Sequence, residues 1–188
     1  MSYVKKLLKC LVSGFVFFII TMNTCNAEME NLFGNAIYKT THETPAKGEH
    51  IYRAYVYDYF FQSNRHIEIS IEKCNVVYDD NKNIDHYVYA IEITQKTNEQ
   101  PFDVKKVMIA SEYDSVEIPV NSPPNIFKGL DYITNRIVYR DTGKVNIVLE
   151  SISIKMLIRI TSEYSTYDFY PSLSYIVGAQ KVAKWALN

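Results

Sequence analysis

Alternation of apolar and polar side chains is the feature that most constrains how this chain folds. From residue 50 to residue 93 apolar positions tend to recur at every second residue, as they do in strands whose two faces have different surroundings. The clearest run places three isoleucines between polar residues: His66, Ile67, Glu68, Ile69, Ser70, Ile71 and Glu72. This pattern predicts half-buried strands of an antiparallel sheet.

The segments on either side of this run predict its neighbours in the sheet. Residues 50–61 are dense in Tyr and Phe, and both faces are largely apolar or aromatic, which favours an interior strand. Residues 87–93 alternate again after a polar turn. We therefore expect a three-stranded antiparallel meander. The apolar phase slips by one residue near Cys74, which predicts a bulge there.

The second half of the chain mixes strand and helix patterns. Residues 116–120 and 136–140 read as short strands, and residues 104–110 fit a strand or a helix, of which we favour the strand because the segment is short. Residues 145–160 read as a long strand run with a bend near 150–151, because their apolar phase changes there. Ile126, Phe127 and Leu130 have helical spacing after Pro124.

The last segment predicts an amphipathic helix over residues 172–187. Its apolar residues recur at helical spacing, and Lys181 and Lys184 lie near the C-terminal end, where cations suit the helix dipole. We expect the helix to dock on the sheet through five residues: Ile176, Val177, Val182, Ala183 and Ala186.

Together these elements predict an α+β fold. We expect an antiparallel β-sheet of about six to nine strands with the C-terminal helix packed on one face. A β-sandwich is the alternative. Residues 50–188 would form a single β-rich domain, and residues 28–49 would lead into it.

The N-terminus has the composition of a signal peptide over residues 1–27. Lysines at 5, 6 and 9 precede the apolar run 11–20, and Cys25-Asn26-Ala27 places small residues at the −3 and −1 positions of a cleavage site. We expect the mature protein to begin at Glu28 and to be exported to the periplasm or beyond. An uncleaved anchor and a lipid-modified Cys25 are the alternatives.

Cleavage there would change the composition that bears on partners. It removes three of the 20 basic residues and none of the 21 acidic ones, which leaves 17 against 21 and a formal net charge of −4. This balance argues against a nucleic-acid surface. Cys74 would be the only mature cysteine, so no intramolecular disulfide is expected. The mature chain has no Asn-x-Ser/Thr site, and these features together fit a bacterial envelope protein.

Metal and cofactor sites are not predicted. Residues 79–85 carry oxygen ligands at alternate positions, but Ile84 and Ala90 stand where a calcium loop needs Gly and Glu. His66 and Glu68 share a strand face and are too few for zinc, and the histidines are widely spaced.

Catalytic residues are not predicted either. Cys74 lies in an apolar pattern, which indicates a buried structural thiol. Glu68 and Glu72 are interpreted as solvated. No nucleophile elbow or phosphate-binding glycine loop occurs.

Tyrosine is the residue type that points to function. Fifteen of the sixteen tyrosines lie after residue 27, and tyrosine is enriched at recognition surfaces. Two clusters give the candidate binding residues, which are Tyr55, Tyr57, Tyr59, Tyr164, Tyr167 and Tyr170.

The sequence therefore favours a non-catalytic exported envelope protein that binds another protein, such as a periplasmic inhibitor or immunity-type protein. One alternative is a carrier of a small ligand or lipid with an aromatic-lined pocket. The other alternative is an enzyme without a recognisable motif.

Overall fold

Two antiparallel sheets and two helices make up the computed structural model, which describes residues 26–31, 36–62, 65–79, 87–96, 103–120, 125–140 and 142–186. The seven-stranded sheet has the order β1-β2-β3-β4-β5-β9-β8, and the four-stranded sheet has the order β11-β10-β6-β7. The predicted α+β class, with an antiparallel sheet and a C-terminal helix on one face, is confirmed. The predicted signal peptide, apart from Asn26 and Ala27, lies outside the described residues.

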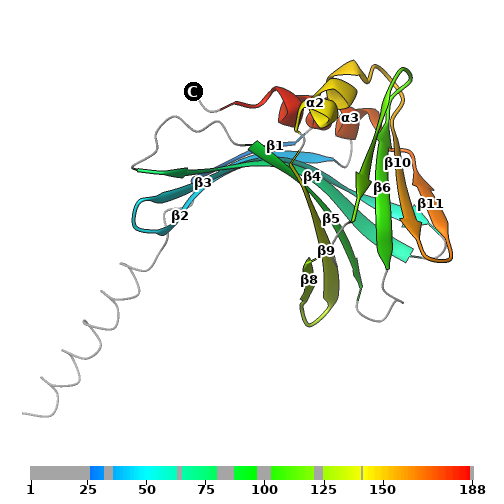
Figure 1. The fold of residues 1–188 in the computed structure, drawn as a ribbon, viewed down its shortest axis with the longest axis horizontal. Coiled ribbons are helices and arrows are strands. Elements are labelled where there is room, and N and C mark those ends of the chain that lie inside the picture. Colours follow the sequence, from blue (N-terminus) through cyan, green and yellow to red (C-terminus); the bar gives the residue numbers. More distant parts are fainter. Residues whose placement is uncertain are drawn as a thin grey trace, which may run out of the picture.

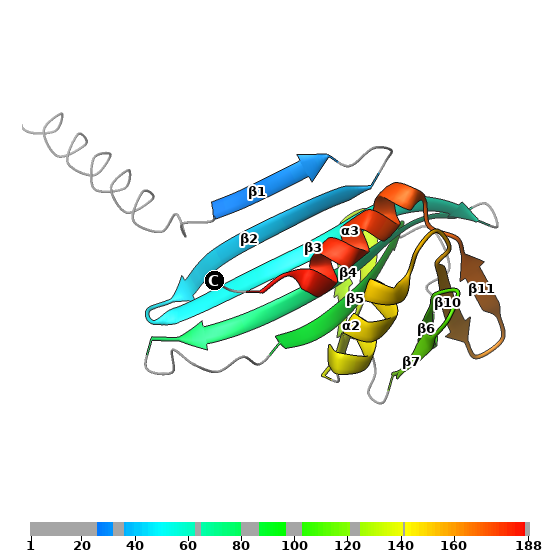
Figure 2. The same cartoon turned by 90° about the horizontal axis from the view of Figure 1, so that it is seen from above.

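The larger sheet is an arch with a concave and a convex side (Figure 1). The helices and the four-stranded sheet lie on its convex side (Figures 1 and 2). The strands of the arch, in spatial order, are β1 (Asn26–Asn31), β2 (Ile37–Ala46), β3 (Glu49–Gln62), β4 (Arg65–Tyr78), β5 (Tyr87–Lys96), β9 (Tyr132–Tyr139) and β8 (Asn125–Lys128). The remaining elements are β6 (Val104–Ala110), β7 (Ser115–Pro119), α2 (Thr142–Ser151), β10 (Leu157–Ser162), β11 (Thr166–Phe169) and α3 (Leu173–Lys184).

The predicted meander is β3-β4-β5, and β3 is an interior strand as expected. The β2–β3 hairpin turns at Lys47 and Gly48, where Gly48 has a φ of 78°. A side chain there would be strained, and its Cβ would lie 3.2 Å from Asp79 Oδ2. β3 and β4 then pair without interruption from Gln62↔Arg65 to Glu49↔Tyr78. This long hairpin is the middle of the arch.

The convex face of the arch is the apolar one. Ile67, Ile69 and Ile71 on β4 are fully buried, as are Ile91 and Ile93 on β5. They belong to one core cluster with residues of the four-stranded sheet and of both helices. Fully burying an aliphatic side chain contributes about 1.5–3 kcal/mol, so this face supplies most of the stability of the fold.

Helix α3 is held on the convex face at both ends. Ser172 caps its N-terminus by accepting a hydrogen bond from the Tyr175 backbone N–H, and Ser172 also donates to the buried Asp58 of β3 at 3.2 Å. At the other end the buried Lys73 of β4 donates to the carbonyls of Ala183 and Trp185, each at 2.8 Å. An acid at the N-terminus and a cation at the C-terminus both suit the helix dipole.

The predicted docking of α3 is confirmed, although its contact face differs in part. Ile176, Val182 and Ala183 are buried, whereas Val177 and Ala186 are exposed. The residues that complete the buried face are Ser174, Tyr175, Gly178 and Ala179. Residue 177 falls just outside the buried stripe of the helix.

Residues 145–160 do not form one long strand. Positions 142–151 are helix α2, and only 157–162 are strand, as β10. Val145, Val148, Leu149 and Ile152 are buried, which is helical spacing, and Ile147 is 60% exposed. From Met156 onward the even-numbered residues Met156, Ile158 and Ile160 are buried, as the strand pattern predicts. A short apolar run fits both periodicities, and packing decides between them.

Three smaller expectations also differ from the structure. The helical spacing at 126–130 is wrong, because residues 125–128 are strand β8. No bulge occurs near Cys74, since the pairing of β4 with β3 and β5 runs through it in register. The segment 28–49, predicted as a lead-in, contains β2 and most of β1, both hydrogen-bonded into the arch. The polar run Thr40–Thr44 conceals the strand pattern there.

Candidate functional site

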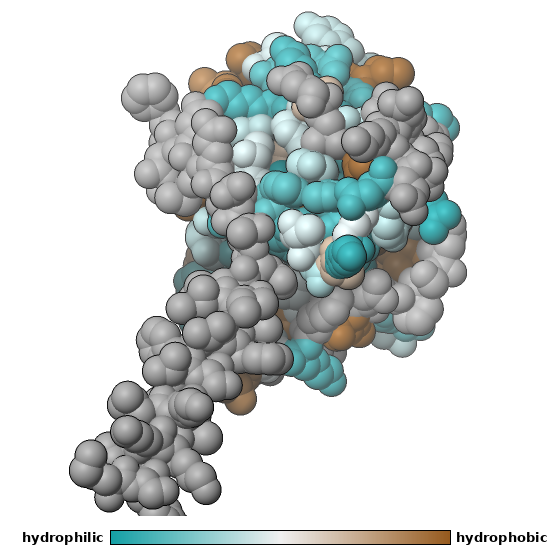
Figure 3. All heavy atoms as spheres, turned by 90° about the vertical axis from the view of Figure 1, so that its left-hand side faces the viewer, coloured by the Kyte–Doolittle hydropathy of each residue, from teal (hydrophilic) through white to brown (hydrophobic). Residues whose placement is uncertain are grey.

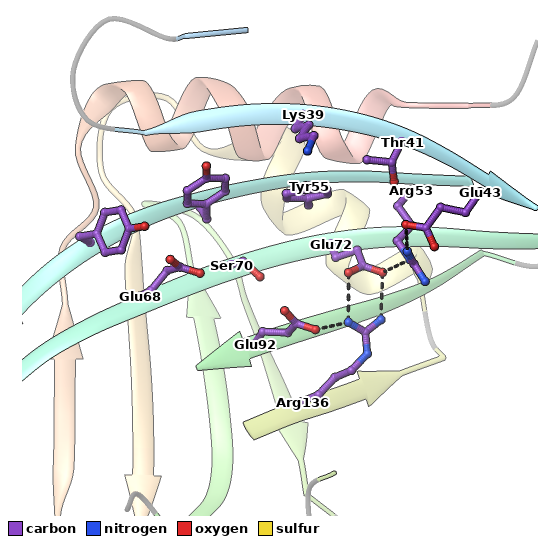
Figure 4. Close-up of a pocket in the computed structure, with 12 residues that line it drawn as sticks. Lys39, Thr41, Glu43, Arg53, Tyr55, Glu68, Ser70, Glu72, Glu92 and Arg136 are labelled. Atoms are coloured by element: carbon purple, nitrogen blue, oxygen red, sulfur yellow. Dashed lines mark hydrogen bonds and ion pairs between the residues drawn. The ribbon is translucent and has the colours of Figure 1, made fainter. Parts of the chain in front are cut away.

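The concave face of the arch carries a groove, which lies on the side opposite the helices (Figure 4). Tyr55, Tyr57 and Tyr59 of β3 stand on this face, directly across from Glu72, Ser70 and Glu68 of β4. The next strands add Glu92 and Arg136, which are register partners. The groove has a volume of about 600 Å³ and is lined by twelve residues: Lys39, Thr41, Glu43, Arg53, Tyr55, Tyr57, Tyr59, Glu68, Ser70, Glu72, Glu92 and Arg136.

One half of the groove is a network of ion pairs across five strands, β2, β3, β4, β5 and β9 (Figure 4). Arg136 of β9 donates to both carboxylate oxygens of Glu72, at 2.9 and 3.0 Å, and also to Glu92. Arg53 lies 3.4 Å from Glu72 through its Nε and donates to Glu43 at 2.7 Å. The two guanidinium groups therefore hold three carboxylates in place and offset most, though not all, of their negative charge.

Burial makes this network more than a surface feature. Only 8% of the Glu72 side chain is exposed. Hydrogen bonds from Arg136 to Glu72 raise the pKa of the arginine. Burial opposes the charge of Arg53, but the Glu72 and Glu43 carboxylates outweigh it and the pKa of Arg53 is raised as well. Both arginines therefore remain charged at any physiological pH.

The other half of the groove is the tyrosine row of β3. Tyr55 and Tyr57 stack with ring centroids 6.1 Å apart, and Tyr59 meets Tyr57 edge-on at 6.2 Å. Burial raises the pKa of Tyr55 despite the nearby Lys39. Tyr59 is 62% exposed, and its hydrogen bond to Glu68 raises the pKa of its hydroxyl to about 12. The row thus presents ring surface and hydroxyl groups to solvent.

A second cavity adjoins the tyrosine end of the groove. It has a volume of about 430 Å³ and is lined by Tyr59, His66, Glu68, Thr94, Lys96 and Tyr132. Tyr59 and Glu68 line both cavities. The two cavities therefore form one continuous concave surface from β2 to β9.

The second tyrosine cluster lies elsewhere. Tyr164 is 89% exposed and Tyr170 is 72% exposed, on either side of strand β11 of the four-stranded sheet. Tyr167 is partly buried and packs against the core. None of the three lines the groove, so the structure brings together only Tyr55, Tyr57 and Tyr59. A binding role for all six remains a prediction.

Sequence reasoning missed the charged half of the site. Glu72, interpreted as solvated, is buried in the ion-pair network. Arg53 and Arg136 belong to no recognisable sequence motif. A signal did exist, because opposite charges on the same face of neighbouring strands stabilise their pairing. Using that signal requires knowing that Arg136 pairs with Glu92, and register is set by the whole sheet.

The cysteine and the described histidines considered from the sequence lie outside the groove lining. Cys74 is a free thiol, buried as predicted, and burial raises its pKa. The histidines are closer than their spacing indicates, since His42 Nε2 lies 3.1 Å from His50 Nδ1 and His50 Nε2 lies 3.0 Å from Asp79. Over the described ranges, no three His, Cys, Asp or Glu side chains are grouped to hold a metal ion. The possible calcium segment lies outside those ranges beyond Asp79.

Hydrophilic residues also dominate the described surface at the β2 and β3 end of the arch, where apolar residues lie mainly toward the margins (Figure 3).

In the part of the chain that the structure describes, no helix has both the length and the apolar composition needed to cross a membrane. Comparison of the chain with protein-family models, curated proteins and solved structures gave no match. The groove is therefore interpreted from its own residues.

Proposed function

We propose that this chain is an exported, non-catalytic binding protein that holds a partner protein against the concave face of the arch. The observation that carries the proposal is the asymmetry of the seven-stranded sheet. Helices and a second sheet cover one face, whereas no described helix or second sheet covers the other, which carries an aromatic and charged groove. Open grooves lined by tyrosine and arginine are typical of recognition surfaces.

Energetics supports a role in recognition over a role in stability. A partly buried ion-pair network adds little net stability, because desolvation of the charges offsets their attraction. Apolar residues at the same positions would stabilise the sheet at least as well. The groove therefore has a composition that folding does not require, and a fixed array of charges and rings suits the selection of a partner.

A binding role also fits the state of the titratable groups. Glu43, Glu72 and Glu92 are engaged by arginines, and Glu68 accepts a hydrogen bond from Tyr59. Carboxylates held in this way favour recognition over proton transfer. An exported inhibitor or immunity-type protein is the form that agrees with the signal-like N-terminus and the mildly acidic mature chain.

Site-specific photo-cross-linking in the producing cell tests the proposal. A photoreactive phenylalanine analogue is placed at Tyr59 in the groove and, as matched controls, at the exposed Tyr164 and Tyr170. We expect a discrete protein adduct from position 59 and none from the controls. In the same assay Tyr57→Ala should reduce the adduct from position 59. Adducts from position 164 or 170 alone would move the binding surface to the four-stranded sheet and overturn the proposal.

A further inference from the structure

The tyrosine end of the groove holds a carboxylate that the arginine network does not reach. Arg53 and Arg136 pair with Glu43, Glu72 and Glu92. Glu68 lies further along β4, beside Ser70, and is labelled apart from that network in Figure 4. The groups acting on its carboxyl are the Tyr59 hydroxyl and Glu92, and none of them is a cation.

Charge in the groove is therefore unevenly distributed. Its lining has four carboxylates and three cations, and the two arginines lie at the end away from Glu68. Lys39, the third cation, acts on the Tyr55 hydroxyl. Burial raises the pKa of Glu68, which means that desolvation of its charge is not compensated within the groove. Lys96 also lines the adjoining cavity, but it is not among the groups that act on the Glu68 carboxyl, so a positive group from outside would still compensate this charge.

Two tyrosine rings share a cavity with this carboxylate, and His66, Thr94 and Lys96 complete its lining. Tyr59 and Tyr132 both line the cavity that contains Glu68, and both are more than half exposed. The face of an exposed tyrosine attracts a lysine or arginine cation, and the ring also contacts the aliphatic part of such a side chain. A carboxylate between two rings is thus a suitable site for one long basic side chain.

A second observation, independent of Glu68, indicates an occupant that extends along the groove. Thr41 of β2 lines the same groove, is 8% exposed, and its hydroxyl has no hydrogen-bond partner among the described residues. An unpartnered buried hydroxyl is unfavourable, and a backbone amide or carbonyl would satisfy it. From Arg53 to Tyr59 the groove follows six residue steps of β3, or roughly 20 Å, which suits an extended peptide segment.

We propose that the groove binds a basic, extended segment of the partner protein, with one lysine or arginine side chain between Tyr59 and Tyr132 and its cation at Glu68. This inference rests on the proposed function and names the chemistry of the partner. The Glu68 carboxylate would repel an acidic side chain or a phosphate at this position. A neutral glycan would leave the charge of Glu68 uncompensated.

Fluorescence anisotropy with defined peptides tests this inference on the exported protein. The probe is a labelled peptide of four Lys-Ser repeats, and the sign control is the matching Glu-Ser peptide. We expect Glu68→Gln to weaken binding of the lysine peptide about five- to tenfold, as loss of one ion pair and its cation–π setting does. Tyr132→Leu should weaken it about threefold or more, since it removes one ring.

The matched control is Glu117→Gln, which removes a carboxylate on the four-stranded sheet that pairs with Lys106. It should change the affinity less than about twofold, because that carboxylate is exposed and already paired. Equal losses in Glu68→Gln and Glu117→Gln would mean non-specific charge attraction. Absence of binding by the lysine peptide would also overturn the inference. So would binding of a chitohexaose probe that Glu68→Gln leaves unchanged.

The cross-linking assay separates this inference from the proposed function. If Glu68→Gln keeps the adduct from position 59 and Tyr57→Ala loses it, the groove binds a partner but not through a basic side chain at Glu68. If position 59 gives no adduct at all, the proposed function itself fails. Glu68→Gln preserves the shape of the side chain and removes a partly buried charge, so we expect the variant to fold.

Discussion

The two faces of the seven-stranded sheet are made by the same strands and have opposite compositions. On β4 the convex face has Ile67, Ile69 and Ile71, and the concave face has Glu68, Ser70 and Glu72. Aliphatic burial on the first face contributes about 1.5–3 kcal/mol per side chain, whereas partly buried ion pairs on the second contribute close to nothing net. Alternate residues of one strand therefore serve different purposes: those on the convex face stabilise the fold, and those on the concave face form the proposed recognition surface.

The largest expected effect belongs to the convex face. Ile176→Ala in α3 should lower the free energy of unfolding by about 2–5 kcal/mol, because it removes a fully buried side chain and leaves a cavity. Val177→Ala, next to it on the exposed side, should change the free energy by less than about 0.5 kcal/mol. Chemical denaturation measures both. Equal small shifts would mean that α3 is not part of the core.

A smaller loss is expected from breaking the ion-pair network of the concave face. Arg136→Ala should destabilise the protein by about 2–3 kcal/mol, because it leaves the buried Glu72 without its bidentate partner. Arg159→Ala is the control, since the Arg159–Asp168 pair of the four-stranded sheet has similar geometry and more exposure. Its loss should stay below about 1 kcal/mol. Similar losses for the two variants would mean that burial does not distinguish the pairs.

The smallest expected changes in stability come from two carboxylates, Glu68 and Glu112, whose pKa values shift in opposite directions. Burial raises the pKa of Glu68, so its ionised form opposes folding above that pKa. Glu68→Gln should raise the unfolding midpoint at pH 7, and the gain should vanish as the pH falls below the pKa of an unfolded Glu, about 4.3. We expect thermal unfolding between pH 3 and pH 7 to show this convergence.

Glu112, outside the groove, should behave in the opposite way. Backbone hydrogen bonds from Ile154 and neighbouring residues lower the pKa of its carboxyl to about 2. The ionised form therefore stabilises the fold above the unfolded pKa, and this contribution is lost as the pH falls from about 4.5 toward 2. Glu112→Gln should lower the midpoint at pH 7. A midpoint change of the same sign in Glu68→Gln and Glu112→Gln would contradict the assignment of the two sites.

Much of the fold could be predicted from the sequence because strands dominate it. The alternation around Ile69 and the aromatic density of 50–61 identified the centre of the arch, and the spacing around Ile176 identified α3. Helix α2 was not identified, because Val145, Ile147 and Leu149 also fit a strand. Only the position of α2 over the core decides that Val148 is buried and Ile147 is not.

The candidate site could be predicted in its aromatic half only. Tyr55, Tyr57 and Tyr59 share a face by simple alternation within one strand. The charged half joins Glu43, Arg53, Glu72 and Arg136 from four strands, and the chain separation between Glu72 and Arg136 is 64 residues. Contacts of that kind depend on strand order and register, which a single sequence does not specify.

The central claim is that neighbouring residues on the two faces of β3 have different roles, and one paired measurement tests it. Val56→Ala and Tyr57→Ala alter adjacent positions, the first fully buried in the core and the second in the groove. For each variant the free energy of unfolding and the affinity for the protein cross-linked at position 59 are measured. Val56→Ala should lose about 2–3 kcal/mol of stability and keep its affinity. Tyr57→Ala should lose less than about 1 kcal/mol and bind at least about tenfold more weakly. Loss of affinity in Val56→Ala at a temperature where it is folded, with none in Tyr57→Ala, would contradict the account.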